Sequence, residues 1–233
     1  MPLNDKSKYW KVVPIINPHS GKHGQEYFFK GIRAKRIPMT SRLAEQMAGF
    51  TLIERDLRMV TQWLQAIDAM SARPRDRAGH ALTTHDDETH KLVQTLFVAS
   101  LMFYGKCFAD AEGRRIRLDR NWVPFEFKKT HEQMISMRNQ FAAHSGSKGY
   151  ERVQVVLVLP VKDRKIRDSP RLYRELLQTE TVVSFEDDDT SFLRLAMLLQ
   201  RKAVNKLEEL NAKIFQEDIN PKGMDYWLRL KEF

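Results

Sequence analysis

Four long segments of this chain repeat apolar residues at the spacing of an α-helix, and this pattern constrains the fold more than any other feature. The segments cover about 40–70, 86–109, 127–144 and 192–215. Residues three and four apart share one face of a helix, so each segment would have one apolar side to bury. Long helices that follow one another along a chain are typical of a bundle. The sequence therefore predicts a mainly α fold, a helical bundle of four principal helices.

A change of period marks residues 151–187. The run "RVQVVLVLP" is rich in β-branched residues, and "ETVVSF" at 180–185 is a second run of the same type. Such runs favour strands, so we predict a small inserted β-hairpin with a long basic loop at 162–174. A short helix at 170–177 is an alternative for part of this loop. The acids of "EDDD" at 186–189 suit the cap of the next helix, and one of them could instead pair with Arg138.

The two ends of the chain differ from the predicted bundle. Residues 1–39 contain four prolines and a basic run, which indicates an arm with little regular structure beyond a short strand at 10–16. We therefore divide the chain into four parts. They are a basic N-terminal arm at 1–39, a helical bundle at 40–150 and 188–219, a β-hairpin insertion at 151–187, and a C-terminal tail at 220–233.

Composition narrows the class of protein. A chain of 233 residues with 42% hydrophobic residues can bury a sizeable core, and one cysteine excludes an intrachain disulfide and suits a reducing compartment. Neither a secretory signal nor an apolar run of about 18 residues is present, so we expect a cytoplasmic protein that does not enter a membrane. The net charge of +9 favours polyanions such as RNA, although a solvated basic surface would give the same charge.

The third helical segment, with its "MISMRNQFAAHSG" at 134–146, carries the most informative polar residues. Arg138 shares a stripe with Phe127, His131, Met134 and Phe141. A guanidinium in an apolar row requires an anion, from a carboxylate or from a ligand.

His144 stands where this helix is predicted to end. The helix macrodipole at a C-terminus favours the protonated imidazole, so the pKa of His144 should move up toward neutrality, which suits general acid or base catalysis. Six positions separate Arg138 from His144, so the two side chains would not stack on one helix face. A redirected last turn would bring them together, and so would the two-fold axis of a homodimer.

These residues resemble a known family. The stretch "RNQFAAH", with Arg-Asn at its start and His near a helix end, is similar to the R-x(4–6)-H signature of the HEPN superfamily. The resemblance covers about 127–147; the other helices match only in architecture, and the arm and the hairpin have no counterpart. It implies a dimeric helical bundle that cleaves RNA without metal or cofactor, as in toxin–antitoxin, abortive-infection and CRISPR systems. By position, His144 would be the general acid or base, Arg138 would stabilise charge on the phosphorane, and Asn139 would assist.

The resemblance also implies partners, namely RNA, a second copy of the chain and an antitoxin or other regulatory protein. A different class of function remains open, an inert nucleic-acid-binding or protein-interaction module on the same bundle. In that case Arg138 would pair with a carboxylate and His144 would cap the helix.

Three further sets of polar residues are candidates for a place in a functional site. His131 is either a core histidine hydrogen-bonded within the bundle or a side chain that orients Arg138. A basic strip flanked by aromatic residues would suit RNA, and it consists of Arg114, Arg115, Arg117 and Arg120. The histidines at 80, 85 and 90 are spaced by five, which does not place ligands on one helix face, so no metal site is expected.

Overall fold

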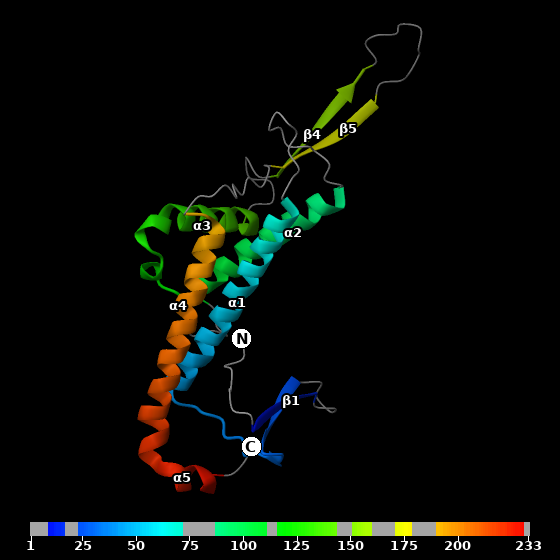
Figure 1. Cartoon of the computed structure of the whole chain (residues 1–233). Coiled ribbons are helices and arrows are strands. Elements are labelled where there is room, and N and C mark those ends of the chain that lie inside the picture. The colour runs from blue at the N-terminus through cyan, green and yellow to red at the C-terminus, as the bar shows by residue number, and fades with distance from the viewer. Residues whose placement is uncertain are drawn as a thin grey trace, which may run out of the picture. The chain divides into compact units, whose positions relative to one another are not determined.

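The computed structural model describes residues 9–16, 23–71, 87–110, 116–143, 151–159, 171–178 and 190–230 (Figure 1). Within these residues the protein is mainly α-helical and has two small antiparallel sheets, which confirms the predicted fold class. Contacts between residues divide the chain into two compact units. The larger one is Gln46–Glu209, and the smaller one combines Met1–Glu45 with Leu210–Phe233.

Four helices match the four apolar segments of the sequence. They are α1 (Arg42–Ser71), α2 (Asp87–Phe108), α3 (Lys128–Ala143) and α4 (Phe192–Lys213). Figure 1 shows α1 and α4 side by side, and a hydrogen bond of 3.3 Å from Gln200 Nε2 of α4 to Glu54 Oε1 of α1 joins them. Near the start of α3, Thr130 donates a hydrogen bond to the carbonyl of Thr190, just before α4 begins. The N-terminal part of α3 is thereby fixed beside the first turn of α4.

The core consists of the apolar faces of these helices. On α1 the buried residues are spaced four, three, four and three apart, as a helix facing one side requires. Complete burial of each such side chain stabilises the fold by about 1.5–3 kcal/mol. The buried residues of α1, α2 and α4 include Ile53, Leu57, Val60, Leu64, Ile67, Phe97, Leu101, Tyr104, Leu195 and Leu199.

Serine side chains begin two of the helices. Ser41 Oγ accepts a hydrogen bond of 3.2 Å from the backbone N–H of Ala44, and Ser191 Oγ accepts one of 3.3 Å from that of Arg194. Each satisfies a backbone donor that a helix start leaves without a partner. The acids at 186–189, predicted to serve this purpose for α4, lie outside the described residues.

The N-terminal arm has more regular structure than predicted. Strand β1 (Trp10–Ile16) was expected, but it pairs antiparallel with β2 (His23–Phe29), which pairs in turn with β3 (Ile32–Arg33). Lys30 and Gly31, with φ of 50° and 81°, form the two-residue turn between β2 and β3, where glycine tolerates the left-handed conformation. The prediction of an irregular arm was wrong because it missed β2 and β3, whose conformation depends on pairing with β1. Pro14 lies on β1, an edge strand, where proline is tolerated.

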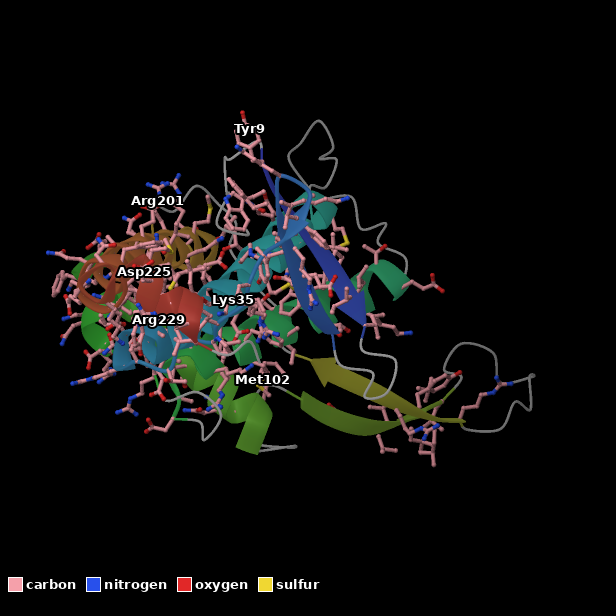
Figure 2. All side chains as sticks on the ribbon, turned by 90° about the horizontal axis from the view of Figure 1, so that it is seen from below. Tyr9, Lys35, Met102, Arg201, Asp225 and Arg229 are labelled. Atoms are coloured by element: carbon pink, nitrogen blue, oxygen red, sulfur yellow. The ribbon has the colours of Figure 1, made fainter. Side chains whose placement is uncertain are left out.

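The C-terminal residues belong to the same small unit. A π-helical turn (η3, Ile214–Ile219) and a 3-10 turn (η4, Asn220–Lys222) lead to α5 (Gly223–Arg229). Lys35 Nζ donates to the carbonyl of Leu228, and the Ser41 hydroxyl donates to Asp218. Tyr9, which precedes β1, is exposed (Figure 2).

The predicted hairpin is present, but its second strand is a different segment. Strand β4 (Glu151–Val158) pairs antiparallel with β5 (Arg171–Gln178). The alternative of a short helix at 170–177 was therefore wrong, and "ETVVSF" lies outside the described residues. The charged residues of "RLYRELLQ" made this strand difficult to recognise in the sequence. Its conformation depends on cross-strand pairs, such as Leu157 with Leu172, rather than on the β propensity of its own residues.

Candidate functional site

Arg138 lies on α3 against the backbone of α2. A Cβ atom built on Gly105 of α2 would stand 3.0 Å from Cγ, 3.1 Å from Cδ and 3.2 Å from Nε of Arg138. The missing side chain at position 105 is therefore what lets the arginine pass this close to the helix. Glycine in a helix interior costs about 0.5–1 kcal/mol relative to alanine, so the close approach has a price in stability. The sequence signal for this contact is the glycine inside "MFYGKCF", in the interior of a predicted helix, and the sequence-based predictions missed it.

The guanidinium of Arg138 has no carboxylate partner in the described part of the chain. Its Nη1 donates a hydrogen bond of 3.0 Å to Asn139 Oδ1, while its Nε is buried without a hydrogen-bond partner among the described residues. The sequence predicted that an arginine in this row would require an anion. Within the described residues that anion is not supplied by the protein.

Several predicted site residues cannot be placed. His144, Arg114 and Arg115 lie outside the described residues. The helix that leads to His144 is described up to Ala143, and its predicted end near 144 lies outside the described residues. The relation between Arg138 and His144 stays a prediction.

A cavity of about 690 Å³ lies beside α3. Its walls come from the end of α2, from residues 117–120 and from α3 itself. Four of the residues singled out in the sequence line it, namely Arg117, Arg120, His131 and Asn139. Arg138 is not part of the lining, but its hydrogen bond to Asn139 connects it to the cavity wall.

His131 is a buried histidine of this wall, with 5% of its surface exposed. Its Nδ1 lies 2.7 Å from the Tyr104 hydroxyl oxygen, and its ring packs against Phe108 with centroids 4.5 Å apart. The hydrogen bond thus goes to Tyr104 and not to Arg138. Burial, and secondly the charge of Arg120, lower the pKa of His131, while Glu132 opposes them. The imidazole is therefore neutral at neutral pH.

The Tyr104 hydroxyl fixes the tautomer of His131. Burial, with a smaller effect of Cys107, raises the pKa of the Tyr104 phenol, so it keeps its proton. A buried O–H without an acceptor is costly, and Nδ1 of His131 is its only partner in the described part of the chain. We therefore assign Tyr104 as the donor and place the imidazole proton on Nε2, the nitrogen that remains for the cavity.

The two arginines of the cavity mouth are engaged in exposed ion pairs. Arg117 pairs with Asp110, and Arg120 Nη2 lies 3.3 Å from Glu132 Oε1. Ion pairs at such exposed positions contribute about 0–1 kcal/mol. A multivalent anion could displace these carboxylates at little cost.

A second charged cluster, which the sequence did not reveal, lies elsewhere in the larger unit. Asp56 of α1 is completely buried, and its Oδ1 accepts hydrogen bonds of 3.2 and 2.8 Å from Nε and Nη2 of Arg55. Lys106 Nζ of α2 lies 3.3 Å from the other carboxylate oxygen. Because both oxygens have cationic partners, this cluster ties α1 to α2 and offers no free group for chemistry.

Some classes of site are not found within the described ranges. No three His, Cys, Asp or Glu side chains come together there as metal ligands. None of the helices described is both long and apolar enough to span a bilayer.

Comparison with known proteins adds no assignment. No family model, curated protein or solved structure matches this chain.

Proposed function

We propose that this chain is a metal-independent endoribonuclease of the HEPN type. The observation that carries the proposal is the state of Arg138, a cation set into a largely apolar face with no carboxylate partner among the described residues. Leaving a buried polar group unpaired costs about 1–3 kcal/mol, and more when the group is charged. A phosphate that approaches Nη1 and Nη2 would supply the missing anion.

The chemistry needs no metal. A ribose 2′-hydroxyl attacks the adjacent phosphorus, the bond to the 5′-oxygen breaks, and the products carry a 2′,3′-cyclic phosphate and a 5′-hydroxyl. In this proposal His144 accepts the proton of the attacking hydroxyl or donates one to the leaving oxygen. Arg138 stabilises the charge that develops on the phosphorane oxygens, and Asn139 holds Arg138 in place through its amide oxygen.

The proposal extends to partners and setting. The substrate is RNA, which suits the net charge of +9. A homodimer through α3 would bring two copies of Arg138 and His144 to one cleft, and an antitoxin or other regulatory protein would restrain the activity in the cytoplasm. A role as a toxin or phage-defence effector fits such an activity. Light scattering of the purified protein tests the dimer directly.

The test is RNA cleavage in excess EDTA with analysis of the product ends. Wild type should cut and leave cyclic phosphates, while Arg138→Ala and His144→Ala should lose about 10²–10³-fold in rate. Arg201→Ala is the matched control, because it removes the same charge from an exposed position of α4 that does not line the cavity (Figure 2). Circular dichroism should show that all three variants fold.

Two results would count against the nuclease. Cleavage that stops in EDTA would mean a metal-dependent activity. Wild type that binds RNA without cutting it, with both variants binding equally well, would favour the inert binding module, in which Arg138 and His144 are structural.

A further inference from the structure

The cavity beside α3 offers hydrogen-bond donors that the protein does not use. Asn139 gives its amide oxygen to Arg138, which leaves its amide nitrogen to donate. Ser136 Oγ accepts a hydrogen bond of 3.2 Å from Gln140 Nε2, which leaves its hydroxyl proton. His131 engages Nδ1 with Tyr104 and keeps the proton on Nε2. Three neutral donors therefore share one wall.

Each of the two acids in the cavity lining already has one carboxylate oxygen engaged, so the free donors outnumber the free carboxylate oxygens. Asp119 Oδ1 accepts a hydrogen bond of 2.8 Å from the backbone N–H of Asn121, and Glu132 Oε1 accepts from Arg120. A surplus of donors selects a ligand rich in acceptor atoms, because a donor of the ligand would find few free partners.

The remaining walls are apolar at the floor and basic at the mouth. Phe108 provides an aromatic face and Leu118 and Ile135 add apolar surface, while Arg117 and Arg120 are exposed. A planar ring would cover the floor, and an anion attached to it would meet the arginines. The volume of about 690 Å³ lies in the usual range of small-ligand sites, about 300–1,000 Å³.

From this arrangement we propose that the cavity binds one uridine nucleotide, whose base presents two carbonyl oxygens, with its phosphate at Arg117 and Arg120. Ser136, Asn139 and His131 donate to the edge of the base, while the apolar floor supports its face. The inference rests on the proposed function in one respect, since the bound nucleotide is taken to be part of the RNA cut at Arg138. Asn139 joins the two places, because it lines the cavity and holds Arg138. The cavity would then select the nucleotide next to the cleaved bond.

Calorimetric titration of the full chain with single nucleotides tests the cavity without any cleavage. UMP should bind about tenfold or more tightly than GMP, AMP, CMP or inorganic phosphate, because the other bases offer at most one carbonyl oxygen to these donors. Ser136→Trp would fill the cavity from an exposed position of α3 and should abolish binding. Gln133→Trp, an equally exposed position of the same helix that does not line the cavity, should bind as wild type does.

Several results would overturn the inference. They are equal affinity for all four nucleotides, phosphate binding as tightly as the nucleotides, and Ser136→Trp binding like wild type. If all nucleotides fail to bind, the cavity is not a nucleotide site. Circular dichroism and thermal melting of both tryptophan variants show whether the fold is kept.

A competition experiment distinguishes a nucleotide within an RNA chain from a free nucleotide as the ligand of the cavity. A single-stranded RNA of uridines should displace the bound mononucleotide. Failure of the RNA to compete assigns the cavity to a free nucleotide and overturns its link to RNA. If wild type cuts no RNA at all, the proposed nuclease fails while the titration still decides whether the cavity binds nucleotides.

Discussion

Asp56 and Arg138 are two charged side chains on the helices of one unit, and they are treated in opposite ways. Asp56 is completely buried and has cations on both carboxylate oxygens, Arg55 on one and Lys106 on the other. Arg138 passes over Gly105, the neighbour of Lys106 in α2, and no acid meets it in the described part of the chain. Two successive residues of α2 thus lie against a charge that has cationic partners and a charge that has no acid partner among the described residues.

The difference separates charges that hold the fold from charges that await a ligand. Breaking a buried pair strands its partner, so a compensated charge is tied to stability. An uncompensated cation costs stability instead, and that cost is offset when an anion binds. Substitution of Asp56 should therefore mainly lower stability, whereas substitution of Arg138 should mainly weaken the binding of an anion.

The largest effect is expected at the compensated charge. Asp56→Ala leaves Arg55 and Lys106 without their acceptor, but both are about half exposed and can regain water. We therefore expect a loss of about 2–3 kcal/mol in the free energy of unfolding, below the full cost of a stranded buried ion. Urea denaturation measures it. Asp68→Ala, at an exposed position of the same helix, should change stability by less than about 0.5 kcal/mol.

Equal effects of the two substitutions would contradict this view of Asp56. In that case its contacts would be no more valuable than those of a surface acid, and the contrast with Arg138 would fail. RNA cleavage by Asp56→Ala, measured where the variant is folded, should match wild type.

The helical part of the fold could be predicted from the sequence because its signal is local. The apolar spacing of Leu57, Val60 and Leu64 already defines which side of α1 is buried. Strand β5 was misassigned because its conformation depends on pairing with β4, a partner distant in sequence. The strand β2 was missed because "HGQEYFF" contains no β-branched residue, so its conformation depends on pairing with β1.

The candidate site was predictable only in part. The charge of Arg138 in an apolar row predicted that it requires an anion, from a carboxylate or from a ligand, and no carboxylate meets it among the described residues. The contacts of Tyr104 with His131 and of Gly105 with Arg138 join α2 to α3. Such contacts depend on how two helices pack, which periodicity within each helix does not define. Asp56 was missed because a single acid within a helical segment forms no sequence pattern that would predict its burial.

A smaller effect is expected where α2 and Arg138 meet. Gly105→Ala would gain about 1 kcal/mol of helix propensity, but the new Cβ would crowd Arg138 Cγ at 3.0 Å and Cδ at 3.1 Å. Gly105→Ala alone should therefore give no gain in the free energy of unfolding. In an Arg138→Ala background, where the crowding is gone, the same substitution should stabilise the protein by about 1 kcal/mol.

Gly49→Ala provides the control for this double-mutant cycle. Its Cβ would crowd Ile116 instead, also at 3.0 Å, so its effect should be the same with and without Arg138. Additive effects of Gly105→Ala and Arg138→Ala in urea denaturation would show that the arginine does not lie against α2 in solution.

The smallest effect concerns His131, a third titratable side chain of these helices. Unlike Asp56 and Arg138, it is neutral in the folded protein. Its folded pKa is lowered from 6.5 by burial and by Arg120, against the opposing effect of Glu132, whereas in the unfolded chain the pKa is not lowered. As pH falls below about 6.5, the unfolded state takes up a proton before the folded state does, so stability is lost down to the lowered folded pKa. His131→Asn keeps an acceptor for Tyr104 but does not titrate. Urea denaturation at pH 7.5 and 5.5 should therefore show a larger loss for wild type than for His131→Asn, with the other histidines cancelling in the difference. Equal losses would mean that the imidazole gains a proton as easily in the folded protein as in water. That result would contradict both the burial of His131 against Tyr104 and its role as a neutral donor to the cavity.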